Sequence, residues 1–214
     1  MKIGTTRVET FSDSVMAIII TIMVMELIPD FSAKEVTPHS YFYNKETLAK
    51  SIAYLLSFTM IGIFWLNHHN FFHILKKTNE QLLIQNLGFL FIISIIPVTT
   101  TMIGANPSDP LSVALYGGVM LLTTILLSVM RVYAERKALI HKEDDKNLNS
   151  KIFRMTSKAR KKNYIGIVAY LISIPLAFIS VYISFACFVI PPIIFFIPDG
   201  VDDEKLAEKI AEKE

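Results

Sequence analysis

The sequence is poor in the residues that build disulfide frameworks and nucleic-acid-binding surfaces. Its single cysteine, Cys187, stands in an apolar run, which excludes internal disulfides, and we interpret this residue as packing. Charged residues are only 19% of the 214, and the formal net charge of +2 is too small to favour nucleic acid as a partner. No nucleophile stands beside a base, so we expect neither an enzyme nor a bound cofactor.

Histidine is also scarce, and this bears on the segment FWLNHHNFFH at residues 64–73. The segment resembles one histidine box of a membrane di-iron desaturase, but such enzymes use several boxes and this chain has five histidines in all. We therefore expect no metal site. Trp65, His68 and His69 are instead expected to pack or to form hydrogen bonds inside the protein.

The sequence is rich in long apolar blocks. Hydrophobic residues make up 52% of the chain, which is typical of a membrane protein. The last block, residues 164–197, would measure about 51 Å as one helix, so we divide it by a turn near Ser180 to Ser184. The sequence predicts an all-α integral membrane protein with six spans, five being the weaker alternative, in a domain at 1–198. The expected spans are 6–28, 48–72, 82–103, 111–130, 164–180 and 183–198.

Basic residues predict the orientation of these spans. If the N-terminus is cytoplasmic, eighteen of the 21 Lys and Arg residues fall on that side, and only Lys34, Lys45 and Lys50 fall on the other. This asymmetry predicts that both termini are cytoplasmic. Residues 131–163 are expected to form a basic cytoplasmic linker, either solvated or an amphipathic helix that can meet lipid headgroups, and residues 199–214 a charged cytoplasmic tail. No cleavage site follows Leu27, so the first span is expected to be retained.

The first span, RVETFSDSVMAIIITIMVMEL at residues 7–27, is short between its charges. Twelve uncharged residues separate Asp13 from Glu26 and cover about 18 Å of a hydrocarbon core roughly 30 Å thick. At 100° per residue, one stripe of this helix gathers mainly apolar side chains, with Thr21 about 60° from its centre. The stripe consists of Arg7, Phe11, Ser14, Ile18, Ile22 and Met25.

Asp13 points about 140° away from this stripe on the same helical wheel. A carboxylate at this depth is costly against lipid, so we expect it to face other helices, where Trp65, Asn67, His68 and His69 offer partners. The plainer alternative is that Arg7, Ser12 and Asp13 only cap a helix start in the headgroup layer. The shortness of the uncharged segment favours burial in protein.

The run Arg7-Val-Glu-Thr-Phe11-Ser12-Asp13 resembles the RxxxFSD signature of the transmembrane protein 175 family, the endosomal and lysosomal potassium channels and their bacterial relatives. The continuation AIIITIMVMEL, the segment FWLNHH and the six-span layout are similar to that family as well. There is no internal repeat, so the chain resembles the bacterial single-repeat members. The resemblance implies a homotetramer in a bacterial cytoplasmic membrane, surrounded by lipids, with the first helices lining a central pore.

The resemblance also implies roles for individual residues. Ile18 matches the hydrophobic pore constriction, Ile22 and Met25 match the next layers outward, and Thr21 matches a position implicated in potassium preference. Arg7, Phe11, Ser12 and Asp13, with Trp65, His68 and His69, would belong to the network that holds the pore helices in register.

The implied function is a potassium channel that is weakly selective over sodium. No TVGYG-type segment is present, so a filter of backbone carbonyls is not expected, and an Ile18 ring would act as a dewetting barrier that potassium passes more readily. The alternative is a secondary ion transporter of the bacterial inner membrane, which would require broken helices in corresponding halves of the chain.

Overall fold

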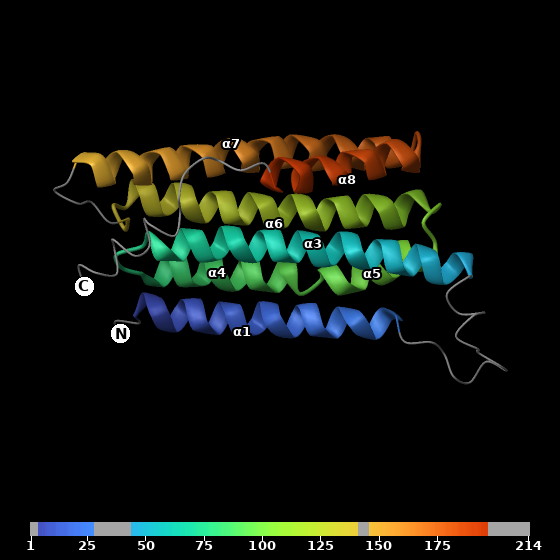
Figure 1. Cartoon of the computed structure of the whole chain (residues 1–214), viewed down its shortest axis with the longest axis horizontal. Coiled ribbons are helices and arrows are strands. Elements are labelled where there is room, and N and C mark those ends of the chain that lie inside the picture. Colours follow the sequence, from blue (N-terminus) through green and yellow to red (C-terminus); the bar gives the residue numbers. More distant parts are fainter. Residues whose placement is uncertain (1–3, 28–43, 141–145, 197–214) are drawn as a thin grey trace.

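The structure, a computed structural model, describes residues 4–27, 44–140 and 146–196, which fold into helices joined by turns (Figure 1). The first part of the chain forms α1 (Thr5–Met23), a short 3-10 helix η1 (Val24–Leu27) and α3 (Lys45–His73). It is followed by α4 (Glu80–Ile93), α5 (Ile96–Ala105), α6 (Pro110–Arg136), α7 (Lys146–Ala177) and α8 (Val181–Phe196).

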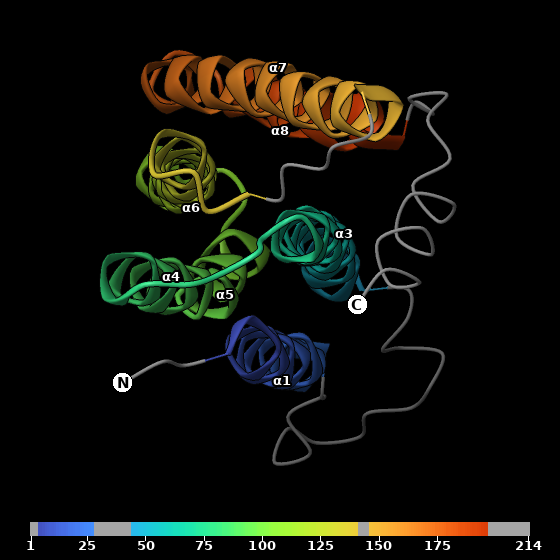
Figure 2. The ribbon, with the colours of Figure 1, turned by 90° about the vertical axis from the view of Figure 1, so that its left-hand side faces the viewer.

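The helices lie side by side along the long axis of the molecule (Figure 1). Seen end on, α1 lies at one edge, and α3 with α4 and α5 forms the next layer. Helix α6 follows, and α7 with α8 lies at the opposite edge (Figure 2). Helix α1 therefore packs on α3 and α4, whereas α6 contacts helices on both of its sides.

Helices α4 and α6 begin where the sequence supplies a capping side chain. The side-chain oxygen of Asn79 accepts a hydrogen bond from the Leu82 N–H at 2.9 Å, and that of Asp109 accepts one from the Ser112 N–H at 2.9 Å. These bonds satisfy backbone donors that lack a partner within the first turn. Pro110 occupies the start of α6, where the missing N–H of proline costs nothing.

The predicted span 82–103 is interrupted, and the sequence analysis did not anticipate the break. Pro97 has no N–H to donate to the carbonyl of Ile93, so α4 ends at Ile93 and α5 begins at Ile96. The Oγ of Ser94 donates to the Phe91 carbonyl at 2.7 Å at this point. A side-chain hydroxyl thus satisfies a backbone carbonyl at the break, as a membrane environment requires.

A chain of buried hydroxyl groups joins α5 to α3 and α6. The Oγ1 of Thr100 donates to the Oγ of Ser57 at 2.8 Å, and that Oγ donates to the hydroxyl of Tyr116 at 3.1 Å. All three side chains are buried. These bonds fix the short helix α5 against its neighbours despite the break before it.

Three helices in the described ranges are long and apolar enough to cross a membrane by length and composition: Lys45–His73, Glu80–Ala105 and Pro110–Arg136. Helix α8 is apolar but shorter. Helix α1 carries Arg7, Glu9 and Asp13 in 19 residues, and the first half of α7 is rich in Lys and Arg. Both nevertheless run alongside the three longer spans (Figure 1). The prediction of an all-α protein with six membrane helices is confirmed, with α4 and α5 counted as one interrupted span.

Helix boundaries differ from the expected ones in the second half of the chain. Helix α6 continues to Arg136 and α7 begins at Lys146, so most of the segment 131–163 is helical and continues the helices on either side of it. The turn between α7 and α8 lies at residues 178–180, slightly before the expected position, and the Ser180 N–H bonds the Leu176 carbonyl at 2.8 Å. The expected tail 199–214 lies outside the described residues.

Helix α6 approaches α7 and α8 closely at Gly117. A Cβ placed there would lie 2.8 Å from the Oγ of Ser173 and 3.2 Å from a ring carbon of Phe188. The adjacent Gly118 has open space around its Cα. A side chain at Gly117 would force these neighbouring atoms to shift, so glycine favours the close approach of the helices.

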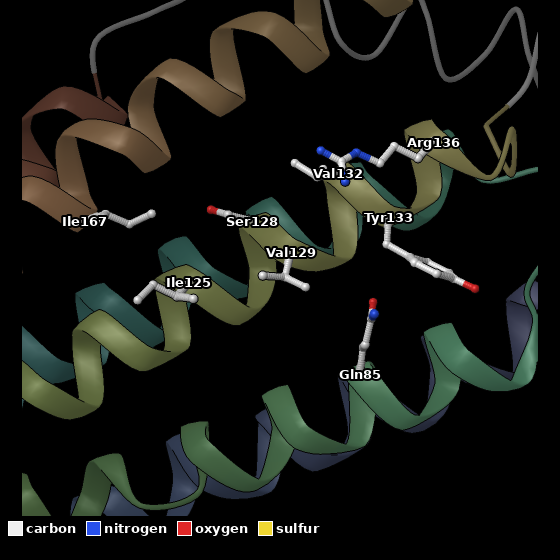
Figure 3. Close-up of a pocket in the computed structure, with 8 residues that line it drawn as sticks. All are labelled: Gln85, Ile125, Ser128, Val129, Val132, Tyr133, Arg136 and Ile167. Atoms are coloured by element: carbon white, nitrogen blue, oxygen red, sulfur yellow. The ribbon is translucent and has the colours of Figure 1, made fainter.

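An open groove of about 440 Å³ lies between α4, α6 and α7 (Figure 3). Its walls are mostly apolar, and Gln85 points into it from α4. No residue of α1 lines it, so it is separate from the uncovered face of α1 described below. Its lining consists of Gln85, Ile125, Ser128, Val129, Val132, Tyr133, Arg136 and Ile167.

Candidate pore face and the polar contacts behind it

Helix α1 has one covered face and one uncovered face. Val8, Ser12, Met16, Ile19 and Met23 are buried against the rest of the protein. The opposite stripe is open: the exposed fractions of the residues are 52% for Phe11, 57% for Ile18, 53% for Ile22 and 61% for Met25. The open stripe coincides with the one drawn from helical spacing, because side chains that recur every three or four residues share one face.

Two hydroxyl groups lie on the uncovered face among these apolar side chains. The Oγ of Ser14 donates to the Thr10 carbonyl at 2.8 Å. The Oγ1 of Thr21 lies within hydrogen-bond distance of the Ala17 carbonyl at 2.9 Å and of the Ile18 carbonyl at 2.8 Å. Each hydroxyl therefore donates its proton within its own helix, and its oxygen can still accept a further contact. Such oxygens can meet a cation that is partly stripped of water.

A buried hydrogen-bond network holds the other face of α1. The Nδ2 of Asn86 on α4 donates to the Oγ of Ser12 at 2.8 Å, and that Oγ donates to the Val8 carbonyl at 2.8 Å. The Oδ1 of Asn86 lies 2.8 Å from the Nε2 of His68 on α3. All three side chains are buried, so α1, α3 and α4 are joined by a fully enclosed chain of bonds.

The partner of His68 determines which of its ring nitrogens carries a proton. A carboxamide oxygen only accepts, so the Nε2 of His68 must donate to Asn86, and this network assigns the proton to that nitrogen. The ring stacks between Phe72 and Phe89, with centroid distances of 4.4 Å and 5.4 Å. Its Nδ1 is buried without a hydrogen-bond partner among the described residues. The His68 ring thus packs between two aromatic rings, and its hydrogen bond to the Asn86 carboxamide fixes its orientation.

A second contact joins α1 to α3 nearer the surface. The Nε1 of Trp65 donates to the Oδ1 of Asp13 at 3.0 Å, and the indole stacks on the ring of His69 at 5.6 Å. The Nδ1 of His69 lies 3.0 Å from the Oε1 of Glu9. Asp13 is therefore held against α3, away from the uncovered stripe. Arg7 and Phe11, expected in the same network, are exposed in the single protomer and take no part in these contacts.

Two buried residues that matter here were not among the predicted site residues. Asn86 interrupts an apolar block, and this polar residue among Leu, Ile and Phe is the signal that could have identified it. Arg131 was assigned to the linker, but it lies on α6 and is buried, with its Nη2 donating to the Asn67 carbonyl at 2.6 Å. Its guanidinium lies over the ring of Phe71, 5.5 Å from the centroid. No pattern in the sequence indicated that α6 extends as far as Arg136 and so buries Arg131.

These features define a class of protein. The chain is an α-helical, multi-pass membrane protein whose first helix is fixed by buried polar contacts on one side and is left open on the other.

Comparison with known proteins identifies the particular family. The sequence profile of the family described as endosomal/lysosomal potassium channel TMEM175 matches residues 7–97. A protein from Chryseobacterium sp. (strain P1-3) named a potassium channel is 34% identical over 203 residues, which cover 94% of this chain and 97% of that protein. The chain belongs to the TMEM175 family, a family of ion channels and not of enzymes.

Two further comparisons come from Chamaesiphon minutus. A protein of strain ATCC 27169 / PCC 6605 named a potassium channel is 30% identical over 193 residues, covering 87% of this chain and 91% of that protein. A crystal structure described as a lysosomal potassium-selective channel TMEM175 homolog from this organism superposes with a TM-score of 0.69. It covers 89% of this chain and 95% of that one at 24% identity, and so supports the fold.

Proposed function

We propose that this protein is a potassium channel of the bacterial cytoplasmic membrane in which four copies of α1 line a central pore. Relatives that cover most of the chain are named potassium channels, which supports the choice of ion. The observation that carries the proposal is the uncovered stripe of α1, opposite a face held by buried hydrogen bonds.

The composition of α1 favours a pore over lipid as the surroundings of this stripe. Arg7, Glu9 and Asp13 lie within its first nine residues, and the uncovered stripe itself contains Arg7, Ser14 and Thr21. Charged and hydroxyl groups are poorly suited to hydrocarbon, whereas a water-filled path between copies accommodates them. A single half-covered helix cannot enclose a path, so the proposal requires several copies of the chain.

The conducting path is proposed to narrow at apolar side chains rather than at backbone carbonyls. Ile18, Ile22 and Met25 follow one another along the uncovered stripe and would form successive rings in a tetramer. A narrow apolar ring excludes bulk water, so an ion must shed part of its hydration shell to pass. Potassium sheds water more readily than sodium, and the Thr21 oxygen would offset part of the loss. We expect a modest preference for potassium.

The orientation and domain limits are proposed from the distribution of charge. The beginning of α1, the end of α3, the end of α6 and the beginning of α7 lie at one end of the bundle (Figure 1). Basic residues are concentrated at these helix ends, which supports a cytoplasmic location for this end. Residues 1–198 would form the channel domain, and residues 199–214 a cytoplasmic tail.

Flux from liposomes tests the proposal directly. Purified protein in vesicles loaded with potassium should release it at a rate that rises in proportion to the gradient, and mass measurement in detergent should give four chains per particle. A flux that saturates with ion concentration at low turnover would instead support a secondary transporter. A monomeric mass in an active preparation would contradict the pore between copies.

A further inference from the structure

Three potential metal ligands meet where α1 packs against α3. They are the carboxylate of Glu9 on α1 and the imidazoles of His69 and His73 on α3. One ligand atom from each of the three lies within 4.8 Å of the other two. The tightest contact joins the Oε1 of Glu9 to the Nδ1 of His69 at 3.0 Å.

Helical geometry explains why the two histidines act together. His69 and His73 are four residues apart, so their side chains lie on one face of α3, one turn from each other. Their rings meet edge to face with centroids 4.5 Å apart. A His pair at this spacing on a helix is a recurrent zinc-binding arrangement. Helix α1 supplies the third group because Val8, the residue before Glu9, is buried in the packed interface.

The contact between Glu9 and His69 leaves coordination capacity unused. Although 3.0 Å apart, the two atoms are not aligned as a hydrogen bond, and the Nδ1 of His69 is buried without another partner among the described residues. His73 is exposed and Glu9 half-buried, so the group opens to water on one side. An ion can therefore enter from solution and bind the buried Nδ1 of His69.

The donor set selects the class of metal. Two imidazole nitrogens and one carboxylate oxygen suit zinc, whereas calcium and magnesium prefer sites made of oxygen atoms. A tetrahedral zinc ion with bonds of about 2.0–2.2 Å holds its ligand atoms about 3.3 Å apart. The ligand atoms lie within 4.8 Å of one another, so the exposed His73 and Glu9 would rotate toward the ion to reach this spacing, and water can take the fourth position.

We propose that Glu9, His69 and His73 form a zinc site that ties α1 to α3. The site differs from the di-iron arrangement considered for the sequence, because it uses one ion and a carboxylate from the first helix. The ring of His69 also stacks on Trp65, which binds Asp13, so the ion reinforces the contact that orients α1. Binding is independent of which ion the protein conducts.

Zinc titration of the metal-stripped full-length protein in detergent tests the site. Calorimetry with ZnCl₂ should give one ion per chain, and zinc should raise the thermal denaturation midpoint. Glu9→Gln and His73→Ala should each weaken zinc binding at least about tenfold, since changes merely next to a metal ligand cost about 10–100-fold. Titration with magnesium chloride should give no binding of Mg²⁺ to Glu9, His69 or His73.

Glu80→Gln is the matched control, because Glu80 is an exposed carboxylate at the start of α4 and belongs to no ligand group. It should bind zinc as the unaltered protein does. Unchanged zinc affinity in both Glu9→Gln and His73→Ala would overturn the proposal, as would the absence of zinc binding by the unaltered protein. His73→Ala removes only an exposed side chain, so a loss of binding with an unchanged metal-free denaturation midpoint reports the site itself.

Discussion

Helices α1 and α6 differ in how completely their own protomer surrounds them. Helix α6 lies inside the bundle, with α4 and α5 on one side and α7 and α8 on the other (Figure 2). A Cβ at Gly117 of this helix would lie only 2.8 Å from the Oγ of Ser173. Helix α1 lies at the edge and is covered on one face only. The comparison indicates that α6 organises the protomer, whereas α1 is positioned by the protomer for contacts outside it.

Replacing Asn86, which holds α1 through the buried hydrogen-bond network, should produce the largest loss of stability. Asn86→Ala removes the acceptor for His68 and the donor to Ser12 and leaves a buried cavity, which we expect to lower the free energy of unfolding by about 2–4 kcal/mol. Denaturation in detergent measures this. Gln81→Ala, an exposed amide on the same helix, is the control and should cost little. Equal stability of the two variants would show that the network does not hold α1.

Adding one methyl group at Gly117 should destabilise the packing of α6 against α7 and α8. Gly117→Ala places a Cβ against Ser173 and Phe188, and overpacking of this kind costs about 1–3 kcal/mol. Gly118→Ala adds the same group in open space and should be neutral or stabilising, because alanine favours a helix. The two denaturation midpoints, compared side by side, check this. If Gly118→Ala is less stable than Gly117→Ala, the close approach of α6 to α7 and α8 does not determine which side chains α6 can accommodate.

The contact between Asp13 and Trp65 should matter less, because both side chains are partly exposed. Asp13→Ala leaves the indole N–H without its acceptor, and we expect a loss of about 1–2 kcal/mol and a lower yield of assembled protein. Trp65→Phe should have a similar effect, and the double variant should cost less than the sum of the two. Full assembly of Asp13→Ala with altered ion preference would place Asp13 in the pore instead.

Helical spacing predicted the uncovered stripe well, because 3.6 residues per turn fixes which side chains share a face. Ile18, Ile22 and Met25, which share this stripe by spacing, are all exposed in the structure. Partners across helices were harder to predict, since they depend on packing: His68 was expected to form hydrogen bonds, but Asn86 as its partner was missed. Spacing along one helix contains no information about the neighbouring helix.

Helix ends were predicted least well. The break before α5 follows from Pro97. This proline is visible in the sequence, but hydropathy alone does not indicate where a helix breaks. Arg131 was placed in the linker, one residue after the expected span 111–130, yet α6 continues past it and buries it. The Arg131 guanidinium binds a backbone carbonyl and lies over an aromatic ring, and these contacts stabilise it inside the protein. The length of an apolar run in the sequence cannot predict such contacts.

The most direct test of the central claim is the single-channel conductance and potassium preference of Ile18→Asn. Ile172→Asn is the matched control, because Ile172 is 48% exposed on α7 at the opposite edge of the bundle (Figure 2). If Ile18 rings narrow the pore, Ile18→Asn should wet the constriction, raise conductance severalfold and weaken the preference for potassium, whereas Ile172→Asn should change neither. Unchanged conductance and preference in a fully assembled Ile18→Asn protein would contradict the claim that the uncovered face of α1 lines the pore.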